Sequence, residues 1–149
     1  MPENFSFSIE EKPSASDLQT IETGLVEYND SQAELENWRQ MTVFMRDTNC
    51  VVVGGLNGCT HWHWLYISQL WVAQTLRGHG YGREMMLRAE KEALERGCRY
   101  ALLETIDFQA LPFYQKLGYE IYSTLPDYPP GHMRYGLAKR DLSRHAAAK

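Results

Sequence analysis

Three glycines at alternate positions mark the point where a strand-like stretch of this sequence gives way to a helical one. They are Gly78, Gly80 and Gly82, in the segment Arg77–Gly82, which we call the glycine turn. Glycine at such a junction permits positive φ angles, so that several backbone N–H groups can converge on one point. The start of a helix adds a partial positive charge. The turn is therefore predicted to bind an anionic group such as a pyrophosphate, with Arg77 adding a charge-assisted hydrogen bond.

The spacing of the glycines separates several kinds of turn. A Walker loop requires Gly-Lys-Ser/Thr, and Gly82 is followed by Arg83 and Glu84, which excludes that loop. A dinucleotide-binding fingerprint requires GxGxxG and an acidic residue about 20 residues further on. This chain has GxGxG, although Glu104 stands near the required distance. On spacing alone, a tight turn that binds nothing remains an alternative.

Apolar runs before the glycine turn have the character of β-strands. The expected strands are Thr42–Met45, Cys50–Leu56 and Trp64–Val72. Turn-forming residues at 47–49 and at Asn57-Gly58 separate them, which predicts an antiparallel meander. The pair Gly54-Gly55 inside the second run predicts a bulge or a close backbone approach.

The N-terminal part is predicted to add one strand and one helix. Apolar residues alternate with serines over Phe5–Ile9, which predicts a first strand. A helix is expected from Asp17, capped by Ser14 or Ser16. Leu18 and further apolar residues at helical spacing would form one face of it.

A helical period follows the glycine turn, over Gly82–Arg96, and Gly97 stands where a residue of positive φ would end the helix. Two pairs of opposite charge, Glu84 with Arg88 and Glu92 with Arg96, have the spacing that supports a helix. The apolar residues predicted to share one face are Met85, Met86, Ala89 and Ala93.

The remaining segments complete a mixed sheet. Tyr100–Ile106 is apolar apart from Glu104, as expected of a buried central strand, and it forms a right-handed βαβ unit with the preceding strand and helix. A short helix over Gln109–Leu117 and strands over Tyr119–Thr124 and His132–Ala138 follow. The predicted fold is α/β, with an antiparallel N-terminal meander, one βαβ unit and C-terminal strands. It is expected as a single domain over residues 1–149, frayed from about residue 142.

Composition narrows the function. The chain has 149 residues, 44% of them hydrophobic, which suits one domain with its own core. The net charge of −4 and the absence of a basic stripe argue against nucleic acid as a partner. The sequence has no apolar run long enough to span a membrane and no stretch of signal-peptide type. We therefore expect no association with a membrane, and a cytoplasmic location.

The cysteines indicate neither disulfides nor a metal site. There are three, an odd number without a CxxC motif, which suits a reducing compartment. Cys59, His61 and His63 alternate, so on one strand they would share a face and could bind zinc. Because the segment offers only three ligands, no metal is expected.

A second motif follows the predicted central strand. The segment Ala110–Tyr119 reads Ala-Leu-Pro-Phe-Tyr-Gln-Lys-Leu-Gly-Tyr. It resembles the A-x-x-F-Y-x-K-x-G-F/Y signature of the GCN5-related N-acetyltransferase (GNAT) family. The family's Q/R-x-x-G-x-G/A motif fits at Arg77, Gly80 and Gly82. With the order of elements, the resemblance covers most of the chain and implies a GNAT-like acyl-CoA N-acyltransferase fold.

The resemblance implies that acetyl-CoA is the cosubstrate. The backbone at the end of the strand before the glycine turn would pair with the pantetheine arm, and the turn would hold the phosphates. Where the family often has an asparagine that helps to hold the cofactor, this chain has Asp107. The cofactor-binding residues so implied are Leu70, Trp71, Val72, Arg77, Gly78, His79, Gly80, Tyr81, Gly82 and Asp107.

The resemblance also implies direct transfer, in which an amine attacks the acetyl carbonyl in a ternary complex. Tyr114 is the candidate donor to the departing thiolate, the alternative being an aromatic side chain packed at the sheet edge. A backbone N–H near Val72 is the candidate donor to the carbonyl oxygen. Glu104 is the candidate general base, because a carboxylate removed from water is a stronger base. The alternative for Glu104 is a strand-end carboxylate paired with an arginine. The other candidates are His63, Tyr66, Ser68, His132 and water.

The expected function is therefore an N-acetyltransferase that acts on a primary amine of a small molecule or peptide. A non-catalytic acyl-CoA-binding module is the alternative. The acceptor pocket is expected from loops at residues 29–38 and 125–132. The family resemblance also allows a homodimer.

Overall fold

The structure, a computed structural model, describes residues 4–144. They divide into two compact units, one up to Glu36 and the other from Asn37 onward. In the first unit, helix α1 (Ala15–Gln32) confirms the expected helix, and its predicted cap is present because the Asp17 N–H donates to Ser14 Oγ at 3.1 Å. No residue of α1 is buried. No described helix is long and apolar enough to cross a membrane.

The strand predicted over Phe5–Ile9 is wrong. Within residues 4–144 they have no strand partner, and they are exposed. Alternation of apolar and polar residues describes a strand only where a neighbouring strand takes up its backbone hydrogen bonds, and the sheet of this protein begins at residue 39.

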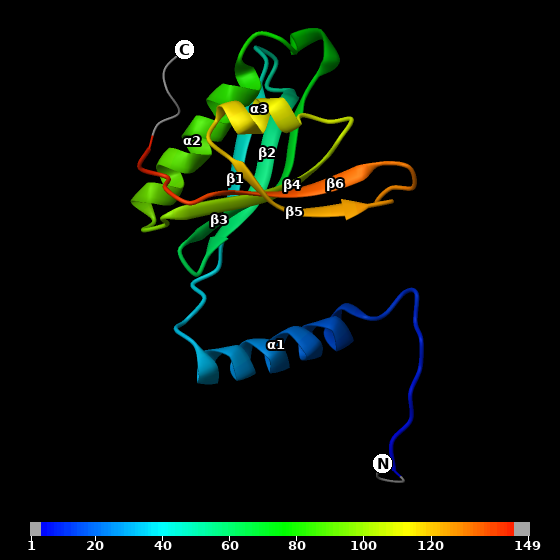
Figure 1. Ribbon diagram of the computed structural model, residues 1–149. Coiled ribbons are helices and arrows are strands. Elements are labelled where there is room, and N and C mark those ends of the chain that lie inside the picture. Colours follow the sequence, from blue (N-terminus) through cyan, green and yellow to red (C-terminus); the bar gives the residue numbers. More distant parts are fainter. Residues whose placement is uncertain (1–3, 145–149) are drawn as a thin grey trace. The chain divides into compact units, whose positions relative to one another are not determined.

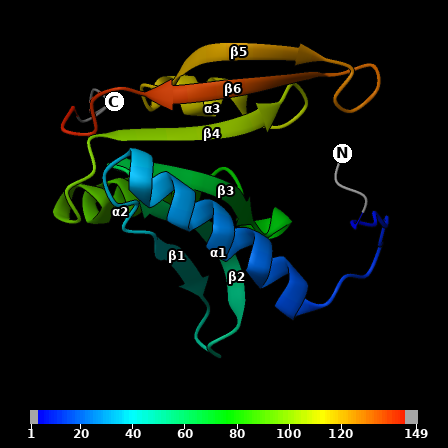
Figure 2. The ribbon, with the colours of Figure 1, turned by 90° about the horizontal axis from the view of Figure 1, so that it is seen from below.

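The second unit contains one six-stranded sheet in the order β1-β2-β3-β4-β6-β5. Only β3 and β4 are parallel, which confirms the meander, the βαβ unit and the mixed α/β sheet. Figure 2 shows β4, β6 and β5 lying side by side. The strands are β1 (Arg39–Arg46), β2 (Val52–His61), β3 (Trp64–Val72), β4 (Tyr100–Ile106), β5 (Glu120–Pro126) and β6 (Met133–Lys139).

Helices α2 (Tyr81–Glu95) and α3 (Leu111–Lys116) lie on the same face of this sheet (Figure 1). The predicted apolar face of α2 is the buried one, and Gly97 ends the helix with φ 87°. A 3-10 helix, η1 (Gln74–Leu76), links β3 to the glycine turn. Pro112 lies in the first turn of α3, where its missing N–H costs no helical hydrogen bond.

The turn predicted at Asn57-Gly58 is wrong, because these residues lie inside β2. The chain reverses at Trp62 and His63 instead, both with positive φ, as a two-residue hairpin turn requires. Gly58 serves another purpose. A Cβ there would stand 2.0 Å from the Tyr66 carbonyl oxygen, so only glycine permits the approach of β3.

Two bulges interrupt the meander. Between β1 and β2 the register shifts beside Gly54, where an added Cβ would lie 3.2 Å from the Trp71 carbonyl oxygen, as Gly54-Gly55 predicts. Between β2 and β3 the pairing passes from Gln69 to Ile67 and leaves Ser68 as an extra residue. The parallel pairing of β3 with β4 stops at the same place, at Ile67 and Leu103. Beyond it the two strands part.

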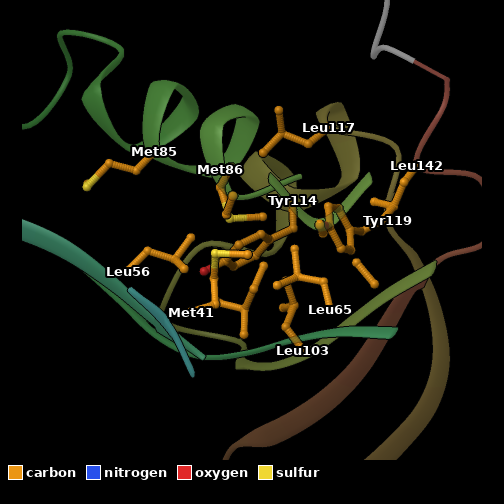
Figure 3. Packing of buried hydrophobic residues seen from close by; sticks show 14 of the residues in the cluster. Met41, Leu56, Leu65, Met85, Met86, Leu103, Tyr114, Leu117, Tyr119 and Leu142 are labelled. Carbon is orange, nitrogen blue, oxygen red and sulfur yellow. The ribbon is translucent and has the colours of Figure 1, made fainter. Parts of the chain in front are cut away.

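The core lies between the sheet and the two helices. Figure 3 shows side chains from α2, α3 and the strands packed together. Leu142 is also buried in this cluster, and its N–H donates to the Arg99 carbonyl oxygen at 3.0 Å. The expectation of fraying from about residue 142 is therefore wrong at Leu142, while residues 145–149 of that tail lie outside the described residues.

A carboxylate that the apolar pattern of α2 did not reveal lies beneath the core. Glu90 accepts a hydrogen bond from Tyr119 at 2.9 Å and an ion pair from Lys139 Nζ at 2.6 Å, and the two charged side chains are only 6% and 5% exposed. Burial, and then the charge of Glu90, raise the pKa of Tyr119 well above its ordinary value, so its hydroxyl stays a donor. The cluster joins α2, β6 and Tyr119, the residue that directly precedes β5.

Replacing Lys139 with alanine is expected to lower the free energy of unfolding by about 3–5 kcal/mol, because the Glu90 carboxylate would stay buried without its counter-charge. Urea unfolding followed by circular dichroism measures this. Lys91→Ala, on the exposed face of α2, is the control and should change the stability by less than about 0.5 kcal/mol. Equal stability of the Lys139 variant and the wild type would contradict the structural role of the cluster.

Candidate active site

A cleft of about 690 Å³ opens where β3 and β4 part. Its walls come from the ends of these strands, from the start of α2 and from α3. Seven predicted site residues line it: Leu70, Trp71, Val72, Arg77, Gly82, Glu104 and Tyr114. The other five, Gly78, His79, Gly80, Tyr81 and Asp107, lie outside its lining.

The edge of β3 at residues 68–72 faces this cleft without a partner strand. The Ala73 N–H donates to the Val53 carbonyl oxygen at 2.9 Å, toward β2. Successive residues of a strand direct their backbone groups to opposite edges, so the N–H and C=O of Val72 point away from β2. In agreement, Arg77 Nε donates to the Val72 carbonyl oxygen at 2.9 Å.

The glycine turn has the backbone shape that its sequence predicts. Gly78 and Gly80 have φ of 80° and 86°, in the left-handed region that side chains disfavour. The first helical hydrogen bond of α2 runs from the Glu84 N–H to the Gly80 carbonyl oxygen. Within the described residues, the N–H groups of residues 78–83 have no protein acceptor. They can therefore donate to an anionic ligand.

Side chains around the turn leave its backbone open. His79 Nδ1 lies 3.2 Å from the Leu76 carbonyl oxygen, and its ring stacks on Tyr81 at 6.1 Å between centroids. Both side chains therefore pack along the turn. Gly82 lies where the start of α2 meets α3, because an added Cβ would lie 3.4 Å from the Phe113 ring.

Tyr114 reaches from α3 into the core beside the cleft (Figure 3). Its ring packs edge-to-face on Phe113 and Tyr119. Within the described residues its hydroxyl has no hydrogen-bond partner. Burial raises the pKa of Tyr114 above its ordinary value. The phenol therefore keeps its proton at neutral pH and is free to donate to a ligand.

Of the two interpretations of Glu104, burial as a general base is wrong and pairing with an arginine is confirmed. Its side chain is 48% exposed, and Arg134 Nη1 donates to it at 3.2 Å. Successive residues of β4 point to opposite faces of the sheet, and Glu104 lies on the face opposite the buried Leu103 and Thr105. Glu104 lines the cleft as half of an exposed ion pair, which removes the physical reason for choosing it as a strong base.

Asp107 does not line the cleft; its partners are the first residue of β6 and the residue before it. Its carboxylate accepts from His132 Nδ1 and from the Met133 N–H, each at 2.8 Å. The Met133 hydrogen bond, ahead of the His132 contact, lowers the pKa of Asp107 despite some desolvation. Asp107 and His132, both named from the sequence for separate roles, are therefore brought together.

The other base candidates lie in less suitable places. Ser68 Oγ donates to the Asn57 carbonyl oxygen at 3.0 Å, and His63 lies in the hairpin turn at the far end of β3. Because β2 ends at His61, Cys59 and His63 do not share a strand. Within residues 4–144, no group of three or more His, Cys, Asp or Glu side chains could hold a metal ion.

Sequence reasoning missed several lining residues, above all Phe108 and Gln109. Phe108 is 59% exposed. Gln109 Oε1 accepts from the Ile106 N–H at 2.8 Å and from Thr105, which fixes the turn after β4. Their position between the central strand and the Phe-Tyr motif was the available signal, because any residue there lies at the end of β4.

The comparisons with known proteins agree with this geometry. The model of the acetyltransferase (GNAT) family matches residues 11–119. Blasticidin-S acetyltransferase of Streptomyces morookaense is 45% identical over 89 residues, which are 59% of this chain and 65% of that protein. Acetyltransferase Atu2258 of Agrobacterium fabrum strain C58 is 30% identical over 135 residues, 91% of this chain and 98% of that protein.

Solved structures show the same fold. The crystal structure of an acetyltransferase from Bacillus cereus ATCC 14579 has a TM-score of 0.79 and 30% identity, over 89% of this chain and 97% of that chain. An aminoglycoside 6'-N-acetyltransferase complexed with coenzyme A has a TM-score of 0.60 at 20% identity, over 69% and 73% of the two chains, a likeness of fold alone. Because the family model matches residues 11–119, which are more than half of the chain, the chain belongs to the GNAT family of acetyltransferases.

Proposed function

We propose that this protein transfers the acetyl group of acetyl-CoA directly to a primary amine in a ternary complex. One observation carries the proposal: a single cleft joins the start of α2 after the glycine turn, the unpaired edge of β3 and the free hydroxyl of Tyr114. These are the parts needed to hold a phosphorylated thioester, stabilise its carbonyl and receive its thiolate.

The chain offers backbone groups for each end of such a cosubstrate. The unpaired N–H groups of residues 78–83 suit the phosphates, with the positive end of α2 behind them. The open edge of β3 suits the amide groups of a pantetheine arm, which could add to the sheet as a further strand would. The coenzyme A complex of the aminoglycoside acetyltransferase, a protein of the same fold, supports this assignment.

Two groups then act on the reacting atoms. The Val72 N–H, which faces the cleft, can donate to the carbonyl oxygen as that oxygen gains negative charge. The Tyr114 hydroxyl, which stays protonated because of its burial, can donate to the sulfur as the C–S bond breaks. Neither group would have to give up an existing hydrogen bond, and the backbone would not have to move, for these contacts to form.

The acceptor is proposed to be a small-molecule amine. The relative that acts on blasticidin S supports this class, although the shared region covers 65% of that protein. A screen of blasticidin S, amino sugars, polyamines and free-amine peptides for thiol release from acetyl-CoA tests the proposal. Binding of acetyl-CoA without turnover of any amine would favour a non-catalytic acyl-CoA-binding module.

Tyr114→Phe is expected to lower kcat about 100-fold, because the thiolate loses its donor, while acetyl-CoA affinity stays within about threefold. Steady-state kinetics and calorimetric titration measure the two effects. Tyr122→Phe, at an exposed position of β5, is the matched control and should behave as the wild type. An unchanged kcat in Tyr114→Phe, with chemistry shown to be rate-limiting, would remove Tyr114 from the mechanism.

Gly80→Ala is expected to weaken acetyl-CoA binding about tenfold or more. A Cβ strains the positive φ of residue 80, and a shift that relieves the strain moves the N–H groups that would meet the phosphates. Gly97→Ala at the other end of α2 is the matched control, because it has φ 87° against 86° and equally open space around it. Equal affinities of the two variants in calorimetric titration would argue against the glycine turn as the phosphate site.

A further inference from the structure

An aspartate–histidine pair closes the end of the sheet next to the cleft. Asp107 directly follows β4, and His132 directly precedes β6. Oδ1 of Asp107 lies 2.8 Å from Nδ1 of His132. Neither residue lines the cleft itself, but the two lie where β4, having parted from β3, reaches its end.

The aspartate is held in place by backbone groups. The Met133 N–H donates to its Oδ2 at 2.8 Å, and its own N–H donates to the Met133 carbonyl oxygen at 2.9 Å. The Met133 hydrogen bond lowers the pKa of Asp107, so the carboxylate stays ionised. An ionised carboxylate at Nδ1 holds the imidazole proton on that nitrogen and leaves Nε2 with a free lone pair.

The imidazole is available to a ligand. His132 is 44% exposed, and among the described residues its side chain has no hydrogen bond besides the one to Asp107. The Phe108 ring packs edge-on against it, with 4.8 Å between centroids, and Phe108 lines the cleft. One aromatic side chain thus forms a wall of the cleft and a support for the imidazole.

The charges around His132 favour it over Glu104 as a proton acceptor. Glu104 already pairs with Arg134, and Arg134 stacks on the Tyr128 ring at 3.8 Å. Asp127 contacts His132 through the backbone, since its N–H donates to the His132 carbonyl oxygen. The carboxylate that faces the imidazole itself is Asp107.

We propose that His132 is the general base of the acetyl transfer and that Asp107 is its positioning residue. The inference rests on the proposed function. Nε2 takes one proton from the ammonium form of the acceptor, and the neutral nitrogen attacks the thioester carbonyl carbon. As the C–S bond breaks, the Tyr114 hydroxyl gives its proton to the sulfur and receives the second proton of the nitrogen, so that coenzyme A leaves as the thiol. His132 then returns its proton to solvent.

The test uses His132→Asn and Asp107→Asn in the full chain. Asparagine at 132 can keep a donor near Asp107 but has no titratable nitrogen. Asparagine at 107 can still accept from Met133 but presents N–H groups to Nδ1, which places the imidazole proton on Nε2. His61→Asn, at the hairpin end of β2 away from the cleft, is the matched control. The probes are acetyl-CoA and blasticidin S, or the best amine of the screen above.

His132→Asn is expected to lower kcat/KM about 100-fold or more at neutral pH, and Asp107→Asn at least about tenfold. Acetyl-CoA affinity and the melting temperature should stay near the wild-type values. The ratio of wild-type to His132→Asn activity should narrow as pH rises, because a free amine no longer needs a base. A purely structural role would not produce that narrowing.

Two results would overturn the inference alone: His132→Asn activity within threefold of the wild type, or a loss that is the same at every pH and accompanied by a lower melting temperature. A wild-type enzyme that binds acetyl-CoA but acetylates no amine would instead overturn the proposed function, and the inference with it. Unchanged kinetics of His61→Asn would show that the loss of activity is specific to position 132.

Discussion

The active site depends on the loss of pairing between β3 and β4 beyond Ile67. Two parallel strands that stayed together would satisfy each other's backbone groups and leave neither an open edge nor a cleft. The extra residue Ser68 bends β3 at that point. Gly58 lets the bent strand approach β2 closely, since any larger residue would meet the Tyr66 carbonyl oxygen. A local irregularity in one strand pair thus opens the cleft in which the two substrates are proposed to bind.

The sequence could predict features that rest on local chemistry. The glycine turn was predictable because positive φ angles at Gly78 and Gly80 leave few other residues possible, and α2 was predictable from its single apolar face. Features set by distant contacts were not. The role of Gly58 comes from β3, and the particular arginine that pairs with Glu104 comes from β6, which no local pattern encodes.

The buried cluster around Glu90 gives the open site a stiff frame. It ties α2, which begins at the glycine turn, to β6, which begins beside His132. The same carboxylate holds Tyr119, which packs against the ring of Tyr114. The cluster therefore connects the parts of the chain that carry the glycine turn, Tyr114 and His132. A cleft between parted strands needs such a frame, because the strands there no longer hold each other.

A binding site made of backbone groups places few restrictions on the side chains around it. Every residue except proline supplies an N–H, so the proposed phosphate site restricts only the positions where a side chain would force the turn out of its left-handed shape, Gly78 and Gly80. Related proteins can therefore replace most side chains of the turn and keep the N–H groups that would bind the same acetyl donor. The Bacillus cereus acetyltransferase, at 30% identity and a TM-score of 0.79, illustrates how far the amino-acid sequence can change while the fold is kept. In such a lineage the residues that bind the acceptor can change while the proposed cosubstrate site stays the same.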